Sequence, residues 1–177
     1  MKKVFLVLMT ALMWSFATGC APGKIHERSY LRAAAISGSQ KKEAALVFFE
    51  EDERLNAEGG DMKSLMSNAE LIRGRDIFTG YTELVIVDGM ECRGLLAHML
   101  NKWRISPSCR VVCCKDGKSL LEEYGAERLI GISEQAVKQG IAPESDIVTV
   151  LGQLCENGVA AAAELRADGT VGSCLIT

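Results

Sequence analysis

Two short apolar runs, separated by a polar segment, begin the folded part of the chain. Apolar runs of this length bounded by turn residues are typical of buried strands. The pattern predicts strands at Leu31 to Ile36 and Ala44 to Phe49, joined by the polar turn Ser37-Gly38-Ser39-Gln40-Lys41-Lys42. The acidic run Glu50 to Glu53 then leads into a predicted loop that contains Gly59-Gly60.

The middle of the chain alternates between helical and strand periodicity. Asp61 is a good helix N-cap, and apolar residues follow it at helical spacing. These residues are Met62, Leu65, Met66, Ala69 and Ile72. Glu83 to Val87 predicts a strand, and Glu91 to Trp103 returns to a helical pattern. Pro107 cannot continue that helix, and Arg110 to Cys114 predicts the next strand.

The following segment has the pattern of three helices. Lys118 to Tyr124 and Ser133 to Gln139 predict short ones. Glu144 to Glu156 predicts a longer helix, whose start we assign to Pro143 because proline fits the beginning of a helix but not its interior. Asn157-Gly158 marks its end.

The last residues predict a β-hairpin. Two apolar runs, Val159 to Leu165 and Thr170 to Ile176, flank Ala167-Asp168-Gly169, and Asp-Gly between such runs is a strong hairpin signal. We therefore expect one α/β (α+β) domain, with a mixed β-sheet flanked by helices and a C-terminal β-hairpin.

The first twenty residues have the pattern of a lipoprotein signal peptide. Lys2 and Lys3 precede an apolar stretch from Val4 to Phe16, and small residues close it in Ala17-Thr18-Gly19-Cys20. The stretch is shorter than the roughly 20 apolar residues that span a bilayer. We expect a signal peptide at 1–19, a lipidated Cys20 with a tether at 20–30, and a folded domain at 31–177. An ordinary cleaved signal is the alternative.

The composition of the chain argues against one class of function. The formal net charge is -3 and the pI is near 5.5, so the chain has no basic footprint for nucleic acid. The 48% of hydrophobic residues and the small number of prolines (3) predict a folded chain.

The order of segments resembles the N-terminal domain of the Ger(x)C family, the lipoprotein C subunits of spore germinant receptors. The resemblance covers most of the chain from Cys20 to about Leu121. It rests on the lipidated cysteine followed by the segments Arg28 to Ile36, Gly74 to Val87, Gly94-Leu95-Leu96, Arg110 to Cys114 and Lys115 to Leu121.

This resemblance implies a non-enzymatic protein without a cofactor other than the covalent lipid on Cys20. In that family the C subunit acts beside two integral-membrane subunits in the inner membrane of the spore, and the complex starts germination when nutrients are present. By resemblance, the chain would lie on the extracytoplasmic face of that membrane and help to assemble such a complex. Its members run to roughly twice this length, so the chain looks like a truncated or single-domain relative.

Six cysteines follow Cys20 and leave several kinds of site open. They are Cys92, Cys109, Cys113, Cys114, Cys155 and Cys174. Six cysteines allow 15 pairings, among which sequence cannot choose. Cys113 and Cys114 would point to opposite faces of a strand, which opposes a shared metal ion. Free thiols packed as small hydrophobes, one or more disulfides, and a redox or metal site all stay open.

Other motifs give weaker functional hypotheses. Gly117-Lys118-Ser119 lacks the earlier glycine of a phosphate loop, because that position is Val112. Ser39 and Lys42 have the Ser-x-x-Lys spacing but fall in a predicted turn. Trp103 and Tyr81 are candidate interface aromatics.

Two other classes of function remain as alternatives. One is an extracytoplasmic solute-binding lipoprotein, which would need a pocket for a small ligand. The other is an envelope protein with cysteine-based redox or metal chemistry, centred on Cys109, Cys113 and Cys114.

Overall fold

The computed structural model describes residues 28–50, 54–89 and 91–177. Within these ranges, strands and helices alternate along the chain. The strands are β1 (Arg28–Ser37), β2 (Lys42–Phe48), β3 (Arg54–Gly59), β4 (Asp76–Phe78), β5 (Leu84–Val87), β6 (Arg110–Cys113), β7 (Ala160–Leu165) and β8 (Val171–Ile176). The helices are α2 (Met62–Arg73), α3 (Cys92–His98), the π-helical turn η2 (Met99–Trp103), α4 (Gly117–Tyr124), α5 (Ala126–Lys138) and α6 (Ile147–Asn157).

The strands form one mixed sheet in the order β3-β2-β1-β5-β6-β7-β8, and β4 pairs with the start of β1. The four central strands β1, β5, β6 and β7 run parallel. An antiparallel hairpin lies at each side, because β2 pairs with both β1 and β3 and β8 pairs with β7. The prediction of a single α/β domain with a mixed sheet and a C-terminal hairpin is therefore confirmed.

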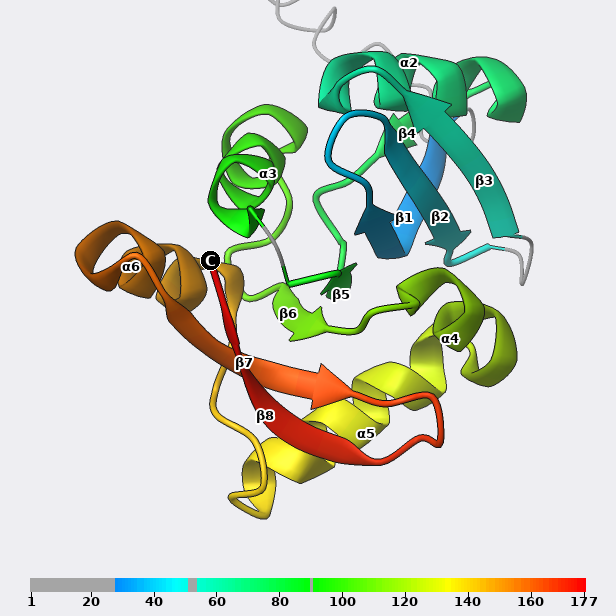
Figure 1. Cartoon of the computed structure of the whole chain (residues 1–177). Coiled ribbons are helices and arrows are strands. Elements are labelled where there is room, and N and C mark those ends of the chain that lie inside the picture. The colour runs from blue at the N-terminus through cyan, green and yellow to red at the C-terminus, as the bar shows by residue number, and fades with distance from the viewer. Residues whose placement is uncertain (1–27, 51–53, 90) are drawn as a thin grey trace, which may run out of the picture.

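Helices cover both faces of the sheet (Figure 1). The first face packs against α2, α3 and α6, and its core includes Leu65, Leu96 and Leu154. The second face packs against α4 and α5, and its core includes Leu121 and Leu129. Because both faces are covered, the central strand β5 is apolar throughout, and every one of its side chains is buried.

Aspartate side chains begin three of the helices. Asp61 forms a capping box with Ser64 at the start of α2. Asp116 accepts a hydrogen bond from the backbone of Ser119 in α4, and Asp146 accepts two from the first turn of α6. Each carboxylate satisfies backbone donors that have no partner inside the helix.

Four elements differ from the sequence-based expectation. Residues 54–59 form the edge strand β3, where we expected a loop, and Asp76–Phe78 forms the short strand β4. Helix α5 begins at Ala126, not at Ser133. Helix α6 begins at Ile147, because Asp146 caps it; Pro143 lies upstream of its start.

None of the helices in the described ranges is both long and apolar enough to cross a membrane.

Candidate functional site

At the carboxyl ends of the parallel strands, two successive connections run to opposite faces of the sheet. From β5 the chain continues into α3 on the first face, whereas from β6 it continues into α4 on the second face. The two connections therefore separate between neighbouring strands. Open α/β sheets commonly bind ligands at such a point.

A polar frame holds the loops at this edge. The backbone N–H of Gly38 donates to Oδ2 of Asp88 at 3.3 Å, which connects the β1–β2 turn to the end of β5. Nζ of Lys42 donates to the carbonyl oxygen of Gly38 at 2.5 Å. The second glycine of the edge, Gly89, has a φ of +90°, and a Cβ there would lie 2.9 Å from Sγ of Cys113. A side chain at position 89 would therefore displace that thiol.

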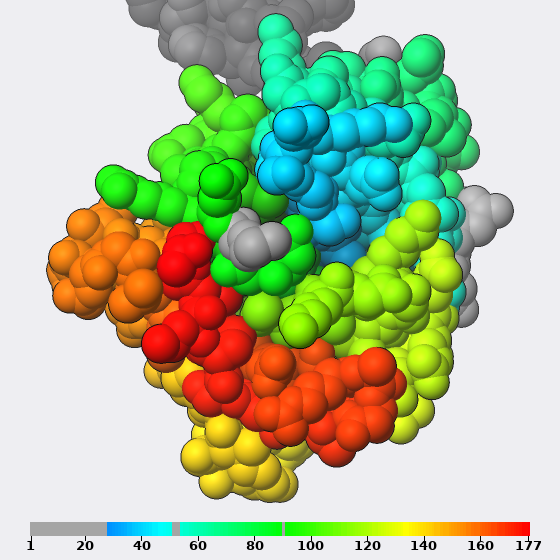
Figure 2. Space-filling model, in the orientation of Figure 1, coloured from blue at the N-terminus to red at the C-terminus, as the bar shows by residue number. Residues whose placement is uncertain are grey.

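Three cysteines from distant parts of the chain meet beneath Gly89. Cys92 begins α3 and is buried, while Cys113 ends β6 and Cys174 lies on β8, both half-buried. The thiols of Cys113 and Cys174 are hydrogen-bonded to each other. In Figure 2 the end of β8 (red) lies next to α6 (orange) and to the green segment that contains α3. The backbone N–H of Cys92 donates to the carbonyl oxygen of Thr177 at 2.5 Å.

The surroundings of these three thiols shift their pKa values in different directions. The S–H of Cys174 donates to Cys113, and this lowers the pKa of Cys113 and raises the pKa of Cys174. Burial, followed by the negative charge of Asp88, raises the pKa of Cys92 to about 11. Cys113 is therefore the thiol of the three that ionises most readily, and a thiolate is the reactive form of cysteine.

The remaining cysteines do not join this cluster. Cys109 is buried in the first core, Cys114 is buried in the second core, and Cys155 is exposed on α6. Cys113 and Cys114 lie on opposite faces of the sheet, as predicted. All six cysteines after Cys20 are free thiols. In the described ranges, no three His, Cys, Asp or Glu side chains form a group that could hold a metal ion.

A groove of about 450 Å³ lies beside the same end of the sheet. Its lining comes from β1, β2, β3, α2, β5 and the start of α4, and it includes the small residues Ala35, Ala45 and Ala57. Glu43 and Lys118 also line it. Two exposed side chains of α2, Leu71 (81% exposed) and Ile72 (63%), line it as well. The groove is thus mostly apolar with a charged border, which suits a small amphipathic ligand.

The structure gives Gly117-Lys118-Ser119 a packing role. A Cβ on Gly117 would lie 2.6 Å from Cγ2 of the buried Ile86, so glycine lets α4 approach the sheet. The N-terminus of α4 is already occupied by the carboxylate of Asp116, whose negative charge opposes a phosphate. Ser39 lies in the turn after β1, as expected.

The opposite end of the sheet carries a cluster of aromatic rings, which we call the aromatic end: Tyr30, Phe49, Phe78 and Tyr81. The rings of Tyr30 and Tyr81 are stacked with centroids 5.9 Å apart, and Phe78 meets both edge-on at 5.6 and 5.2 Å. Tyr81 is 61% exposed and Phe49 is 44% exposed. The interface prediction for Tyr81 thus falls on an accessible ring.

A wider groove of about 810 Å³ runs beside these rings. Charged side chains border it in pairs: Nε of Arg32 is 3.0 Å from Oε2 of Glu83, and Arg110 is 3.9 Å from Glu134. The Arg32 guanidinium also lies 5.3 Å from the centre of the Phe49 ring. Arg32 and Arg110 therefore each have a carboxylate partner beside this groove.

Of the remaining predicted site residues, Trp103 lies elsewhere than expected, and Cys20 falls outside the described residues. Trp103 is buried at 8% exposure, so the expectation that it lies at an exposed interface is wrong; its carbonyl oxygen accepts a buried hydrogen bond from the hydroxyl of Thr79. The lipidation candidate Cys20 falls outside the described residues. Sequence reasoning missed the meeting of Cys92, Cys113 and Cys174, for which no local pattern gave a signal.

Comparisons with protein-family models, curated proteins and solved structures found no match for this chain.

Proposed function

We propose that the chain is a membrane-anchored lipoprotein whose extracytoplasmic domain has a non-enzymatic role in assembling a nutrient-sensing complex of the germinant-receptor type. The signal sequence ending in Cys20 carries this proposal. Its partners would be integral-membrane subunits in the spore inner membrane. The described segments on which the resemblance to Ger(x)C lipoproteins rests form β1, β4, β5, part of α3, β6 and the start of α4. Each of them thus contributes regular structure to the folded domain, which supports the proposal.

The anchor and the role in germination can be tested together. Deletion of the gene should abolish or slow nutrient-triggered germination, and the intact gene should restore it. A Cys20→Ala copy should leave the protein off the membrane and fail to restore germination. The matched control is Cys155→Ala, because Cys155 is exposed on α6 and its thiol packs against no core. Normal germination of the deletion strain would contradict the proposal.

The groove of about 450 Å³ favours a second candidate function, the binding of a small solute. A ligand that binds only the folded state at a concentration of 100 times its Kd stabilises the protein by about 2.7 kcal/mol. Thermal unfolding with each of the common amino acids would reveal such a ligand as a saturable rise in Tm. Asn56→Ala, which changes the groove, should reduce the rise, whereas the exposed control Ser173→Ala should not.

A further inference from the structure

We propose that the aromatic end is the surface by which the domain rests on the lipid bilayer. This inference depends on the proposed anchor at Cys20 and adds the orientation of the domain to it. The contact is made by the rings of Phe49 and Tyr81, which are exposed. Tyr30 and Phe78 pack against the Tyr81 ring through the ring contacts described above, and Arg32 lies over the Phe49 ring.

The length of the tether brings this end close to the membrane. Seven residues, 21–27, separate Cys20 from Arg28, where β1 begins. Eight residue steps span at most about 28 Å when a chain is fully extended. Arg28 lies opposite Asp76 on β4, two residues before the pair of Tyr30 and Phe78. The tether therefore enters the fold beside the aromatic cluster.

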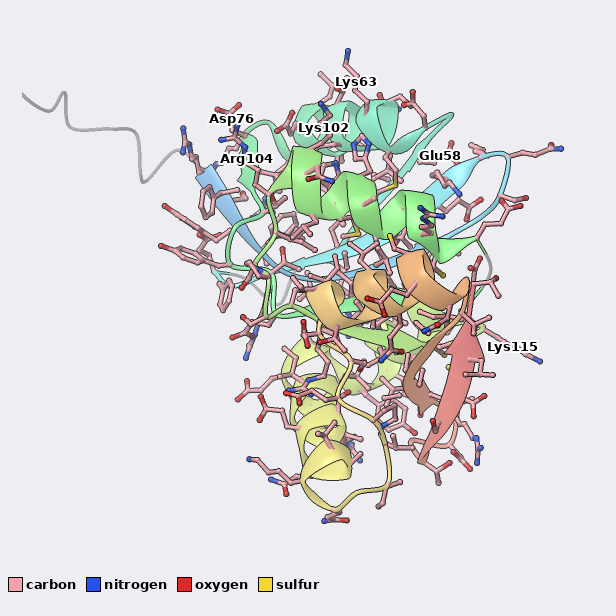
Figure 3. The ribbon with its side chains drawn as sticks, turned by 90° about the vertical axis from the view of Figure 1, so that its left-hand side faces the viewer. Glu58, Lys63, Asp76, Lys102, Arg104 and Lys115 are labelled. Carbon is pink, nitrogen blue, oxygen red and sulfur yellow. The ribbon has the colours of Figure 1, made fainter. Side chains whose placement is uncertain are left out.

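The opposite end of the sheet is farther from the anchor by the length of β1. The nine steps between its ten residues span about 30 Å, which exceeds the full reach of the tether. Figure 3 shows the separation: Asp76 and Arg104 lie toward one end of the molecule, and Lys115, which follows β6, lies toward the other. A domain that stands on its aromatic end therefore keeps the thiol cluster in water.

The chemistry of this end suits the bilayer interface. Tyrosine has an apolar ring and a polar hydroxyl, and it is enriched at the level of the lipid headgroups. The neighbouring guanidinium of Arg32 is paired with Glu83 and lies 3.6 Å from Glu127, so it does not bring a free positive charge. Glu50 adds a carboxylate beside Tyr30, whose N–H donates to it at 3.3 Å. On neutral lipid the contact should therefore rest on the rings and depend little on salt, because a bilayer without net charge does not attract the arginines at the same end, Arg28 and Arg104.

Fluorescence quenching by brominated phosphatidylcholine tests the orientation. The mature chain has one native tryptophan, the buried Trp103, which gives the same background in every variant. Tyr81→Trp and Phe49→Trp place reporters at the aromatic end. Leu175→Trp is the matched control, because Leu175 is 71% exposed on β8, next to the residues that contact the start of α3. Each lipidated protein is reconstituted into vesicles, and flotation and the mass of the Cys20 peptide establish the anchor separately.

We expect the two reporters at the aromatic end to be quenched at least about twofold more than Leu175→Trp, since interfacial rings lie at headgroup depth. The difference should persist in high salt. If the proteins float but Leu175→Trp is quenched as strongly as both other reporters, the proposed bilayer contact is wrong. It is also wrong if the proteins float and no reporter is quenched, and the aromatic end would then be a surface for a protein partner. If the wild-type protein carries no lipid and does not float, the anchor fails, and the inference fails with it.

Discussion

Replacing Gly117 with alanine should destabilise the domain, although the same change in the interior of a helix normally has the opposite effect. Gly117 is the first residue of α4, and its φ is not in the left-handed region. Backbone strain is therefore not the issue. The new Cβ would lie 2.6 Å from Cγ2 and 3.2 Å from Cβ of Ile86, and 3.4 Å from Cβ of Ala35.

The size of the effect follows from how little these neighbours can move. Ile86 is 1% exposed and Ala35 is 4% exposed, and the β-branched side chain of Ile86 has a restricted χ1 angle. Overpacking of a closed core costs about 1–3 kcal/mol. Gly131, inside α5, provides the control because a Cβ there meets nothing within 4 Å. Gly131→Ala should stabilise by about 0.5–1 kcal/mol through helix propensity.

The two variants should thus differ by about 1.5–4 kcal/mol in the free energy of unfolding, with opposite signs relative to wild type. Urea titration measures this directly, and the m-values should be unchanged. In a domain of this size, each kcal/mol shifts Tm by about 2–4 °C. A Gly117→Ala protein as stable as Gly131→Ala would refute the packing role of Gly117 and reopen a role for its loop in binding.

Three further predictions concern the helix caps and the thiols. Asp116→Ala should lower the free energy of unfolding by about 1 kcal/mol at pH 7. Hydrogen bonds from Ser119 hold the pKa of Asp116 below 3.8 in the folded state, so this loss of stability should vanish as the pH falls through that pKa. An equal loss at pH 2 and pH 7 would contradict this. Iodoacetamide at pH 8 should modify Cys155 in the native protein but reach Cys109 only after unfolding, because burial raises the pKa of Cys109 to about 12. Peptide mass mapping measures the order of modification, and modification of Cys109 before Cys155 would contradict this prediction. The folded-state pKa values of Cys92 and Cys109 lie above the ordinary value of 9.0. The free energy of unfolding should therefore fall as the pH rises from about 9 toward 11. Urea titrations at each pH should show a smaller fall for Cys109→Ala than for the wild-type protein.

The elements that sequence predicted well have strong local signals. Asp168-Gly169 specifies the last hairpin, and Asp61 with the apolar stripe after it specifies α2. The edge strand β3 was missed although its residues alternate between exposed and buried. Its buried positions are only Leu55, Ala57 and Gly59, and charged residues surround them. A weakly apolar edge strand forms because β2 and α2 pack against it, and that information lies outside the segment.

The candidate sites depend even more on contacts between distant residues. Cys113 on β6 and Cys174 on β8 are brought together by the fold, although four elements lie between these strands along the chain. The aromatic end joins the starts of β1 and β5 with the end of β2. Each residue alone has an ordinary explanation as core or surface. Their chemistry arises from topology, which local patterns do not encode.

The two ends of the sheet lead to different expectations for ligands and for membrane partners. A domain that stands on its aromatic end holds the carboxyl ends of its parallel strands about 30 Å from the headgroups, given a rise of about 3.3 Å per residue along β1. If the proposed membrane subunits have short loops, these would stay below that height, whereas a dissolved molecule could still approach the groove beside Glu43 and Lys118. Membrane subunits would instead meet the sides of the domain near its base, where the end of α2 is joined to β1 by the hydrogen bond from Nε of Arg73 to Oγ of Ser29 at 2.9 Å. A solute in the groove and a subunit at the base could therefore bind at the same time, with the sheet as the rigid connection between them.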